Sequence, residues 1–213
     1  MRQRHSNPSD TAIALLQAAE RCLQRYGLAG LSTRKVAEEA GMPLSQIHYH
    51  LGSKRGLLLA LLDYQNAKLL ARQHAMFARP QPLWKRWMAA CDYLEEDLAS
   101  GYVRVLQEMI AAGWSDPDIA AEARRILRGW YELLGDVARQ AAEELRGGLG
   151  PLTPAEAAVL AGNLFLGVEA MILLGFSEKE VPSRSALRKV GELLRQLESS
   201  SGAKRHASKI SGS

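Results

Sequence analysis

Cysteine is scarce in this chain, and its two copies, Cys22 and Cys91, stand far apart among 213 residues. Two isolated cysteines exclude the dense disulfide framework of a small secreted domain, and no group of Cys and His residues has the spacing of a zinc site. We therefore expect buried free thiols in a reducing compartment, with no metal and no cofactor. The start, MRQRHSNPSD, contains no apolar run, so the sequence predicts no secretory signal and a cytoplasmic location.

Catalytic signatures are also missing. The sequence holds no G-x-S-x-G elbow, no G-x-G-x-x-G or P-loop phosphate cradle, and no H-E-x-x-H zinc motif. Cys22 and His50, with Asp63 to orient the histidine, have the right chemistry for a nucleophile and base, but nothing in the sequence places them together. We therefore predict that the chain is not an enzyme.

β-branched residues are few, whereas Ala, Leu, Glu and Arg dominate, which favours helix almost throughout. The expected fold class is all-α, with about nine helices at 10–26, 32–40, 45–51, 54–77, 83–99, 102–112, 116–146, 153–175 and 183–199. The first helix is expected to turn four side chains inward: Ile13, Leu16, Leu23 and Tyr26. We expect an N-terminal three-helix domain at 9–56, a C-terminal helical bundle at 57–199, and a disordered tail at 200–213, which is low in apolar residues.

Residues 31–62 carry the start and stop signals of two short helices joined by a tight turn. Ser32 is a good N-cap, and Gly41 stands where a helix needs a left-handed residue to end. Pro43 opens the next helix, in which Ile47 and Leu51 are four residues apart and face inward. Two helices around a short glycine-containing turn make a helix-turn-helix, whose second helix enters the major groove of DNA.

The side chains of this motif suit contact with DNA. Gln can pair with adenine and Ser can contact several base edges, and both occur on the second helix as Ser45 and Gln46. Thr33, Arg34 and Lys54 stand at helix N-termini, where backbone N–H groups and the helix dipole attract phosphate. Taken singly, each has a plainer explanation, such as a solvated charge. Together and in this order they predict a DNA-binding surface.

Residues 11–62 resemble the DNA-binding domain of TetR-family transcriptional regulators. The resemblance rests on Tyr26-Gly27 at the end of the first helix and on the segments LSTRKVA (31–37), Ala40-Gly41 and HLGSK (50–54). It implies that Thr33, Arg34 and Lys54 contact phosphates. It also implies that five residues of the second motif helix face the groove: Leu44, Ser45, Gln46, His48 and Tyr49.

Two residues depart from the family pattern, which usually has Tyr at the position of His48 and Phe at the position of Leu51. Leu51 still fills the core. His48 would alter base preference, or make phosphate contact depend on pH, because histidine titrates near neutral pH.

The charge distribution points to the same end of the chain. Residues 1–56 hold eight Lys and Arg against four Asp and Glu, a net charge of +4 that equals the charge of the whole chain. Residues 57–198 carry a net charge of −3, and the tail adds Lys204, Arg205 and Lys209. A basic head on a slightly acidic body is what phosphate binding by one end requires, although a basic protein with uneven charge has the same pattern.

One long segment, 157–175, has only Asn163 and Glu169 as clearly polar residues. Its length allows a transmembrane span, but Glu169 would be costly in lipid and the flanks lack a basic anchor, so we predict no membrane contact. The better interpretation is a helix buried both against its own bundle and against a second subunit.

The last expected helix supports a partner helix. Leu187, Val190, Leu194 and Leu197 follow a 3-4-3 spacing, which makes a seam for helices packed side by side, within one chain or between two. The TetR resemblance implies a homodimer through the last two helices. Phe165, Val168 and Ile172 of the preceding helix complete the expected interface. Two groove-reading helices about 34 Å apart can read one palindromic site, whereas a single one binds weakly.

Aromatic and Met residues concentrate in the middle of the chain, where a ligand would lie. Such residues suit an apolar, adaptable pocket, although at helical spacing they are more often plain core. The TetR resemblance implies a small-molecule site in this region. The candidate pocket residues are Trp84, Trp87, Met88, Cys91, Met109, Trp114, Trp130 and Phe165.

The sequence thus predicts a ligand-responsive transcriptional regulator, and a repressor rather than an activator. It is expected to bind a palindromic operator in double-stranded DNA as a homodimer, and to be released by a small apolar effector of unknown identity. The alternative is a DNA-binding regulator or architectural protein without a small-molecule effector, although an architectural protein would not need so large a body.

Overall fold

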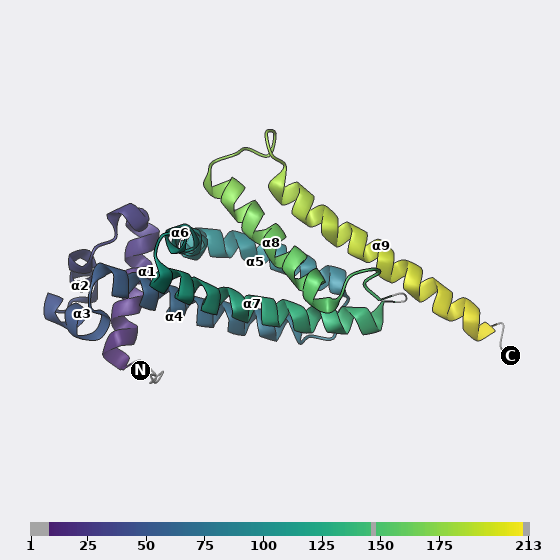
Figure 1. Ribbon diagram of the computed structural model, residues 1–213, viewed down its shortest axis with the longest axis horizontal. Helices are drawn as coiled ribbons and strands as arrows, with labels where there is room; N and C mark the ends of the chain where they lie inside the picture. Colours follow the sequence, from purple (N-terminus) through teal and green to yellow (C-terminus); the bar gives the residue numbers. More distant parts are fainter. Residues whose placement is uncertain (1–8, 146–147, 211–213) are drawn as a thin grey trace. The chain divides into compact units, whose positions relative to one another are not determined.

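The computed structural model describes residues 9–145 and 148–210, and describes side chains in 9–145 and 148–199. All regular structure in these ranges is α-helical, which confirms the all-α prediction. The helices are α1 (Asp10–Gly30), α2 (Thr33–Ala40), α3 (Leu44–Leu51), α4 (Lys54–Phe77), α5 (Leu83–Ser100), α6 (Tyr102–Gly113), α7 (Pro117–Glu144), α8 (Pro154–Leu173) and α9 (Ser183–Ile210) (Figure 1).

Local chemistry explains where most of these helices begin. The Ser32 hydroxyl accepts a bond from the Lys35 amide at 3.3 Å, as an N-cap should. The Asp116 carboxylate accepts bonds from the amides of Asp118 and Ile119 at 3.0 and 3.2 Å, and Pro117 follows it at the first position of α7. Thr153 and Glu156 form a reciprocal capping box at α8. These starts agree with the sequence prediction.

Two helices differ from their predicted extents. Non-helical backbone at Gly27 interrupts α1 one residue after its predicted end, and a short further turn then reaches Gly30. The last helix runs on to Ile210, into the segment that was expected to be disordered from residue 200. That segment contains Ala203, Lys204, Arg205 and Ala207, which are favourable helix formers, so its low apolar content did not prevent helix. Residues 211–213 lie outside the described range.

The chain divides into two compact units. The first comprises the chain up to Lys68 together with Asp97–Glu122, and so contains α1, α2, α3, the first part of α4, and α6. In this unit α1 packs against both α2 and α3 (Figure 1). Its core includes Leu15, Val36, Ile47 and Leu61, none of which exposes more than 1% of its surface. The apolar face of the two motif helices is therefore held against α1, which leaves their other face free.

The second unit comprises Leu69–Glu96 and the chain from Ala123 onward. It contains most of α5 and α7 together with α8 and α9, and the last two lie side by side (Figure 1). Met76, Ile126 and Leu187 form part of its core, each only 1% exposed.

Candidate DNA-binding and self-association surfaces

The helix-turn-helix presents a polar surface built on α3. Gly41 adopts a left-handed backbone (φ 64°) between α2 and α3, a conformation that glycine reaches without steric cost. Ile47 and Leu51 turn inward, with exposures of 0% and 8%. Ser45 and His48 are exposed, and Tyr49 is 83% exposed. Leu44, Gln46 and Thr33 are half-buried. Every residue that was predicted to face DNA thus keeps some accessible surface.

The basic residues of this region fall into two groups. Arg21 and Arg25 both bind the Glu39 carboxylate, at 2.7 and 3.2 Å, and the Lys35 ammonium lies 4.4 Å from the centre of the Tyr26 ring. These cations serve the packing of α1 against α2. By contrast, Arg34 and Lys54 are exposed and make no ion pair with any residue that the structure describes. Those two charges remain available for an external anion.

His48 has a defined tautomer. Its Nδ1 lies 3.0 Å from the carbonyl oxygen of Gly52. Because a carbonyl oxygen only accepts hydrogen bonds, Nδ1 carries the proton and donates. The neutral ring therefore presents Nε2 as an acceptor, whereas the protonated ring presents it as a donor. At His48, where the sequence departs from the family pattern, Nε2 is therefore the ring nitrogen that the bond to Gly52 leaves for another partner.

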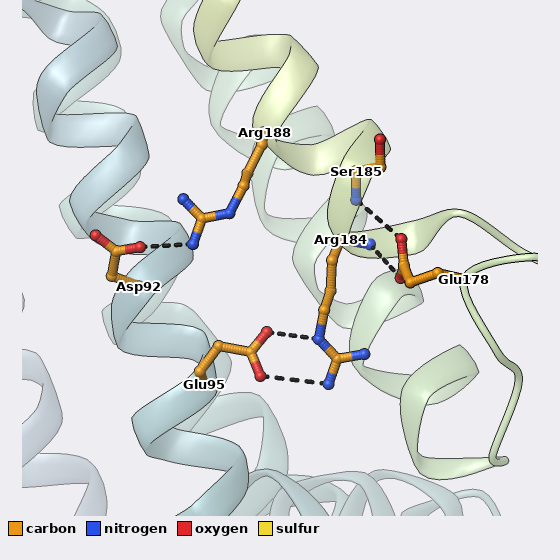
Figure 2. Close-up of polar contacts among 6 residues, drawn as sticks. All are labelled: Asp92, Glu95, Glu178, Arg184, Ser185 and Arg188. Carbon is orange, nitrogen blue, oxygen red and sulfur yellow. Dashed lines mark hydrogen bonds and ion pairs between the residues drawn. The ribbon is translucent and has the colours of Figure 1, made fainter.

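A second surface is formed by α8 and α9, and ion pairs fix its geometry. Figure 2 shows Arg184 donating two bonds to Glu95 of α5, at 2.6 and 3.3 Å, and Arg188 donating to Asp92 at 2.6 Å. The Glu178 carboxylate accepts bonds from the amides of Arg184 and Ser185 at the start of α9. These two amides, that of Arg184 first, lower the pKa of Glu178 below its usual value. One face of α9 is thereby clamped to α5.

Close packing continues along the same face of α9. The Trp87 indole N–H donates to the carbonyl oxygen of Leu187 at 2.8 Å. A Cβ added to Gly191 would lie 2.8 Å from the Met88 sulfur and 3.2 Å from the Trp87 ring, so a larger residue here would require these side chains to shift. Further along, Glu198 accepts bonds from the first two amides of α5, at Leu83 and Trp84. The side of α9 that carries Leu187, Gly191 and Glu198 therefore packs against α5 of the same chain.

Large apolar side chains of α8 and α9 also remain exposed in the part of the chain that the structure describes. Large apolar side chains are 38–58% exposed at Val159, Leu160, Leu164, Leu193 and Leu197. Leu160 and Leu164 on α8 are four residues apart, as are Leu193 and Leu197 on α9, so each pair lies on one side of its helix. We call these five residues the α8–α9 outer face.

The predicted interface residues divide between the two sides. Leu197 lies on the outer face, and Phe165, Ile172, Val190 and Leu194 are half-buried. Leu187 and Val168 expose only 1% and 7%, so they offer almost no surface to a second chain. The 3-4-3 seam failed to separate them because α9 carries apolar residues on both sides. Leu160 and Leu164 of α8 are exposed but were not among the predicted interface residues, because α8 is apolar nearly all round and its sequence marks no preferred face. Leu193 of α9 is exposed too, and it lies outside the predicted 3-4-3 seam.

The predicted pocket residues fall in both units, with Met109 and Trp114 in the first and the other six in the second. Trp87 packs its ring 5.4 Å from that of Phe165, and with Met88 it holds α9 as described above. Trp84 lies at the start of α5, Trp130 is half-buried, and Trp114 is 83% exposed. Met109 alone of the set lines a cavity of the first unit. Trp87 and Phe165 therefore pack helices of the second unit against one another.

The cysteines and the other possible metal ligands of the described residues form no cluster that could bind a metal. Cys22 and Cys91 are free and buried, as predicted, and burial raises the pKa of Cys91 to about 11, which keeps its thiol protonated. No group of three or more His, Cys, Asp or Glu residues in the described ranges could hold a metal ion.

Among the described helices, α8 alone is long and apolar enough to cross a membrane, with a mean hydropathy of 1.6. One such helix is weak evidence, because an apolar helix of a soluble assembly passes the same test.

Comparisons with known proteins agree with this geometry. Residues 15–61 match the family model of bacterial regulatory proteins of the tetR family. Comparison with curated protein sequences gives no significant match.

Solved structures of the family share the whole fold. A TetR transcription regulator from Haloarcula marismortui is 19% identical, with a TM-score of 0.69 over 87% of this chain and 96% of its own. A putative TetR-family regulator from Rhodococcus sp. is 22% identical, with a TM-score of 0.66 over 87% and 98%. A putative transcriptional regulator from Saccharomonospora viridis, in complex with choline, is 21% identical, with a TM-score of 0.66 over 86% and 94%. Residues 15–61 therefore match the DNA-binding segment of the tetR family of bacterial regulatory proteins, and the chain has the fold of solved TetR-family regulators.

Proposed function

We propose that this regulator is a homodimeric repressor that binds a palindromic operator through α3 and is released by a small effector. Residues 9–56 form its DNA-binding domain, and residues 57–199 form the effector-binding and dimerisation domain. The observation that carries the proposal is that the chain exposes two surfaces of opposite chemistry. One is the polar α3 surface with the exposed cations Arg34 and Lys54, and the other is the apolar α8–α9 outer face.

On the DNA, contacts divide between positioning and reading. Thr33, Arg34 and Lys54 bind phosphates and set the register of the head. Ser45 and Gln46 read base edges, Gln46 as a bidentate partner of adenine. The neutral His48 ring accepts a hydrogen bond at Nε2, which favours the amino group of adenine or cytosine. Tyr49, at 83% exposure, is free to reach a phosphate or a thymine methyl group, and the half-buried Leu44 contributes a further apolar contact.

Two copies associate through the α8–α9 outer face. Exposed apolar stripes of this kind mark interaction sites, and an identical stripe on a second copy satisfies them by two-fold symmetry. The half-buried Phe165, Ile172, Val190 and Leu194 border this face and would become more buried in the dimer, whereas Leu187 and Val168 support it from within. A dimer then holds two α3 helices at one spacing, about 34 Å for adjacent turns of one DNA face.

Release by an effector follows from a change of that spacing. An effector acts only through its different affinity for the two conformations, commonly about 1–3 kcal/mol of coupling. The choline complex of the Saccharomonospora viridis protein supports a small-molecule partner for this fold. The protein acts on DNA in the cytoplasm, without catalysis and without a membrane partner. A regulator without an effector remains the second candidate, because three of the predicted pocket residues, Trp87, Met88 and Phe165, pack helices.

Selection of bound sequences from random DNA tests the proposal. A repressor of this design selects a palindrome whose half-sites lie about one or two helical turns apart. Selection of a single asymmetric half-site, or no enrichment at all, would contradict it. A melting-temperature screen with a broad ligand panel separates the two candidates, because a sensor is stabilised by its effector and an effector-free regulator by none.

A further inference from the structure

The first unit contains a cavity of about 350 Å³ beside the start of α4. Its volume lies at the small end of the range for small-molecule sites, roughly 300–1,000 Å³. Carbon atoms make most of its wall, which is formed by Leu28, Leu58, Val105, Met109, Ala112 and Ile119. Lys54, Arg55 and Glu108 also line it. We refer to it as the α4–α6 cavity.

The charged residues of this cavity are not equivalent. Arg55 donates to the Asp116 carboxylate at 2.9 Å and lies 3.8 Å from Asp118, so its charge is already balanced. Lys54 and Glu108 are exposed, and neither has an ion-pair partner among the residues that the structure describes. Lys54 is also the first residue of α4, where the positive end of the helix dipole favours an anion over a cation.

We propose that the α4–α6 cavity binds a small carboxylate with an apolar body, whose carboxylate pairs with Lys54. The apolar part covers the carbon wall, and the Arg55–Asp116 pair stays intact and closes one side. Because Lys54 is also proposed to bind a DNA phosphate, ligand and operator compete for the same ammonium group. Only the competition between ligand and operator rests on the proposed function, because the ligand can bind the cavity without DNA.

Calorimetric titration of the full chain with octanoate tests the cavity. Octanol and octyltrimethylammonium serve as the neutral and cationic probes of equal length. We expect octanoate to bind about three- to fivefold more tightly than octanol, the gain of one exposed ion pair. Equal or tighter binding of either other probe would overturn the carboxylate assignment, and no binding of any of the three would overturn the site.

Substitutions at the end of α6 locate the binding. Ala112→Trp fills the cavity from an exposed position, and Ala111→Trp places the same ring one residue away, also exposed but outside the lining. Octanoate affinity should fall at least about tenfold in A112W and stay unchanged in A111W. Ala112→Met is the smaller filler if A112W melts early. Unchanged affinity in the folded filled variants would overturn the proposal.

A DNA-binding titration with the selected operator completes the test. Octanoate should weaken operator binding by the wild type and by A111W, but not by A112W. Binding of octanoate without any change in operator affinity would overturn the competition at Lys54. If the wild type bound no DNA in the absence of octanoate, the proposed function would fail, while calorimetry would still decide the cavity.

Discussion

The α3 surface and the α8–α9 outer face differ in chemistry. The first exposes charged side chains that a folded chain ordinarily neutralises, and the second exposes apolar side chains that a folded chain ordinarily buries. On the first, Arg34 and Lys54 stay charged and unpaired among the described residues, while the neighbouring Arg21 and Arg25 bind Glu39. On the second, Leu160 and Leu193 leave more than half of their surface in water, while Leu187 on the other side of α9 is buried.

This difference separates two kinds of partner. Contacts between cations and phosphates weaken steeply as the salt concentration rises, because releasing condensed counterions into saltier solution is less favourable. Burial of apolar surface is nearly independent of salt at moderate concentrations. DNA binding should therefore depend on ionic strength while self-association does not. The ion pairs of Figure 2 join α9 to α5 within one chain. They contact neither DNA nor a second copy in this account, but they fix the orientation in which Leu193 and Leu197 remain exposed.

The largest effect is expected from charge on the outer face. The double variant Leu160→Glu/Leu193→Glu places carboxylates where two copies would bury them, and unpaired buried charge is strongly unfavourable. Dimer affinity, measured by analytical ultracentrifugation, should fall by at least about 100-fold. Both positions are more than half exposed, so the folded chain should melt normally. Trp114→Glu, at an 83% exposed site off this face, is the control and should leave the dimer intact.

The next effect concerns base reading by α3. Gln46→Ala should remove about 1–3 kcal/mol of discrimination at one base pair of each half-site. His48→Lys replaces the Nε2 acceptor by a donor, and should shift preference at its own position from adenine or cytosine toward guanine. Binding to arrays of single-base operator variants measures both changes. Unaltered preference in both variants would mean that α3 does not read bases.

A smaller effect is expected from phosphate contacts. Lys54→Ala should weaken all operator variants uniformly, by about tenfold at low salt, and reduce the slope of log affinity against log salt by about 1. The matched control is Lys35→Ala on α2, because that ammonium already lies over the Tyr26 ring. K35A should therefore alter the thermal stability more than the salt slope. Equal slopes in K54A and the wild type would exclude Lys54 from the DNA interface.

The smallest effect is a pH-dependent contribution to stability at the α1–α2 contact. The bond from Arg21 lowers the pKa of Glu39, so the ionised carboxylate stabilises the fold at pH values above its ordinary pKa. This stabilisation is lost as pH falls through the lowered value. Glu39→Gln should thus melt slightly below the wild type at neutral pH and together with it in strong acid. Glu38→Gln, an exposed neighbour, should match the wild type at both pH values.

Local signals in the sequence were sufficient for most of the fold. Ser32, Gly41, Asp116 and Thr153 act within one turn of their own position, so the residues that start and stop helices are legible without a structure. The DNA-binding motif was recognisable for the same reason, because its cations and groove residues follow one another within a short stretch.

What depends on distant partners was not predictable. Tyr26 was expected inside but is 45% exposed, because it packs beneath Lys35 at the edge of α1. Leu187 was expected at the dimer interface, but the indole of Trp87, a hundred positions away in the chain, binds its carbonyl group. The α4–α6 cavity brings Leu28, Leu58 and Val105 together from three helices, and no sequence spacing links them.

The stoichiometry of the operator complex tests the central account most directly. Sedimentation of the wild type and of the L160E/L193E variant, each with a selected operator, counts the chains bound per site. We predict two wild-type chains per operator, and no stable complex of the variant at the concentration that saturates the wild type. A single wild-type chain on each operator, or equal operator affinity for the two proteins, would contradict the division of this molecule into a DNA-binding surface and a self-association surface.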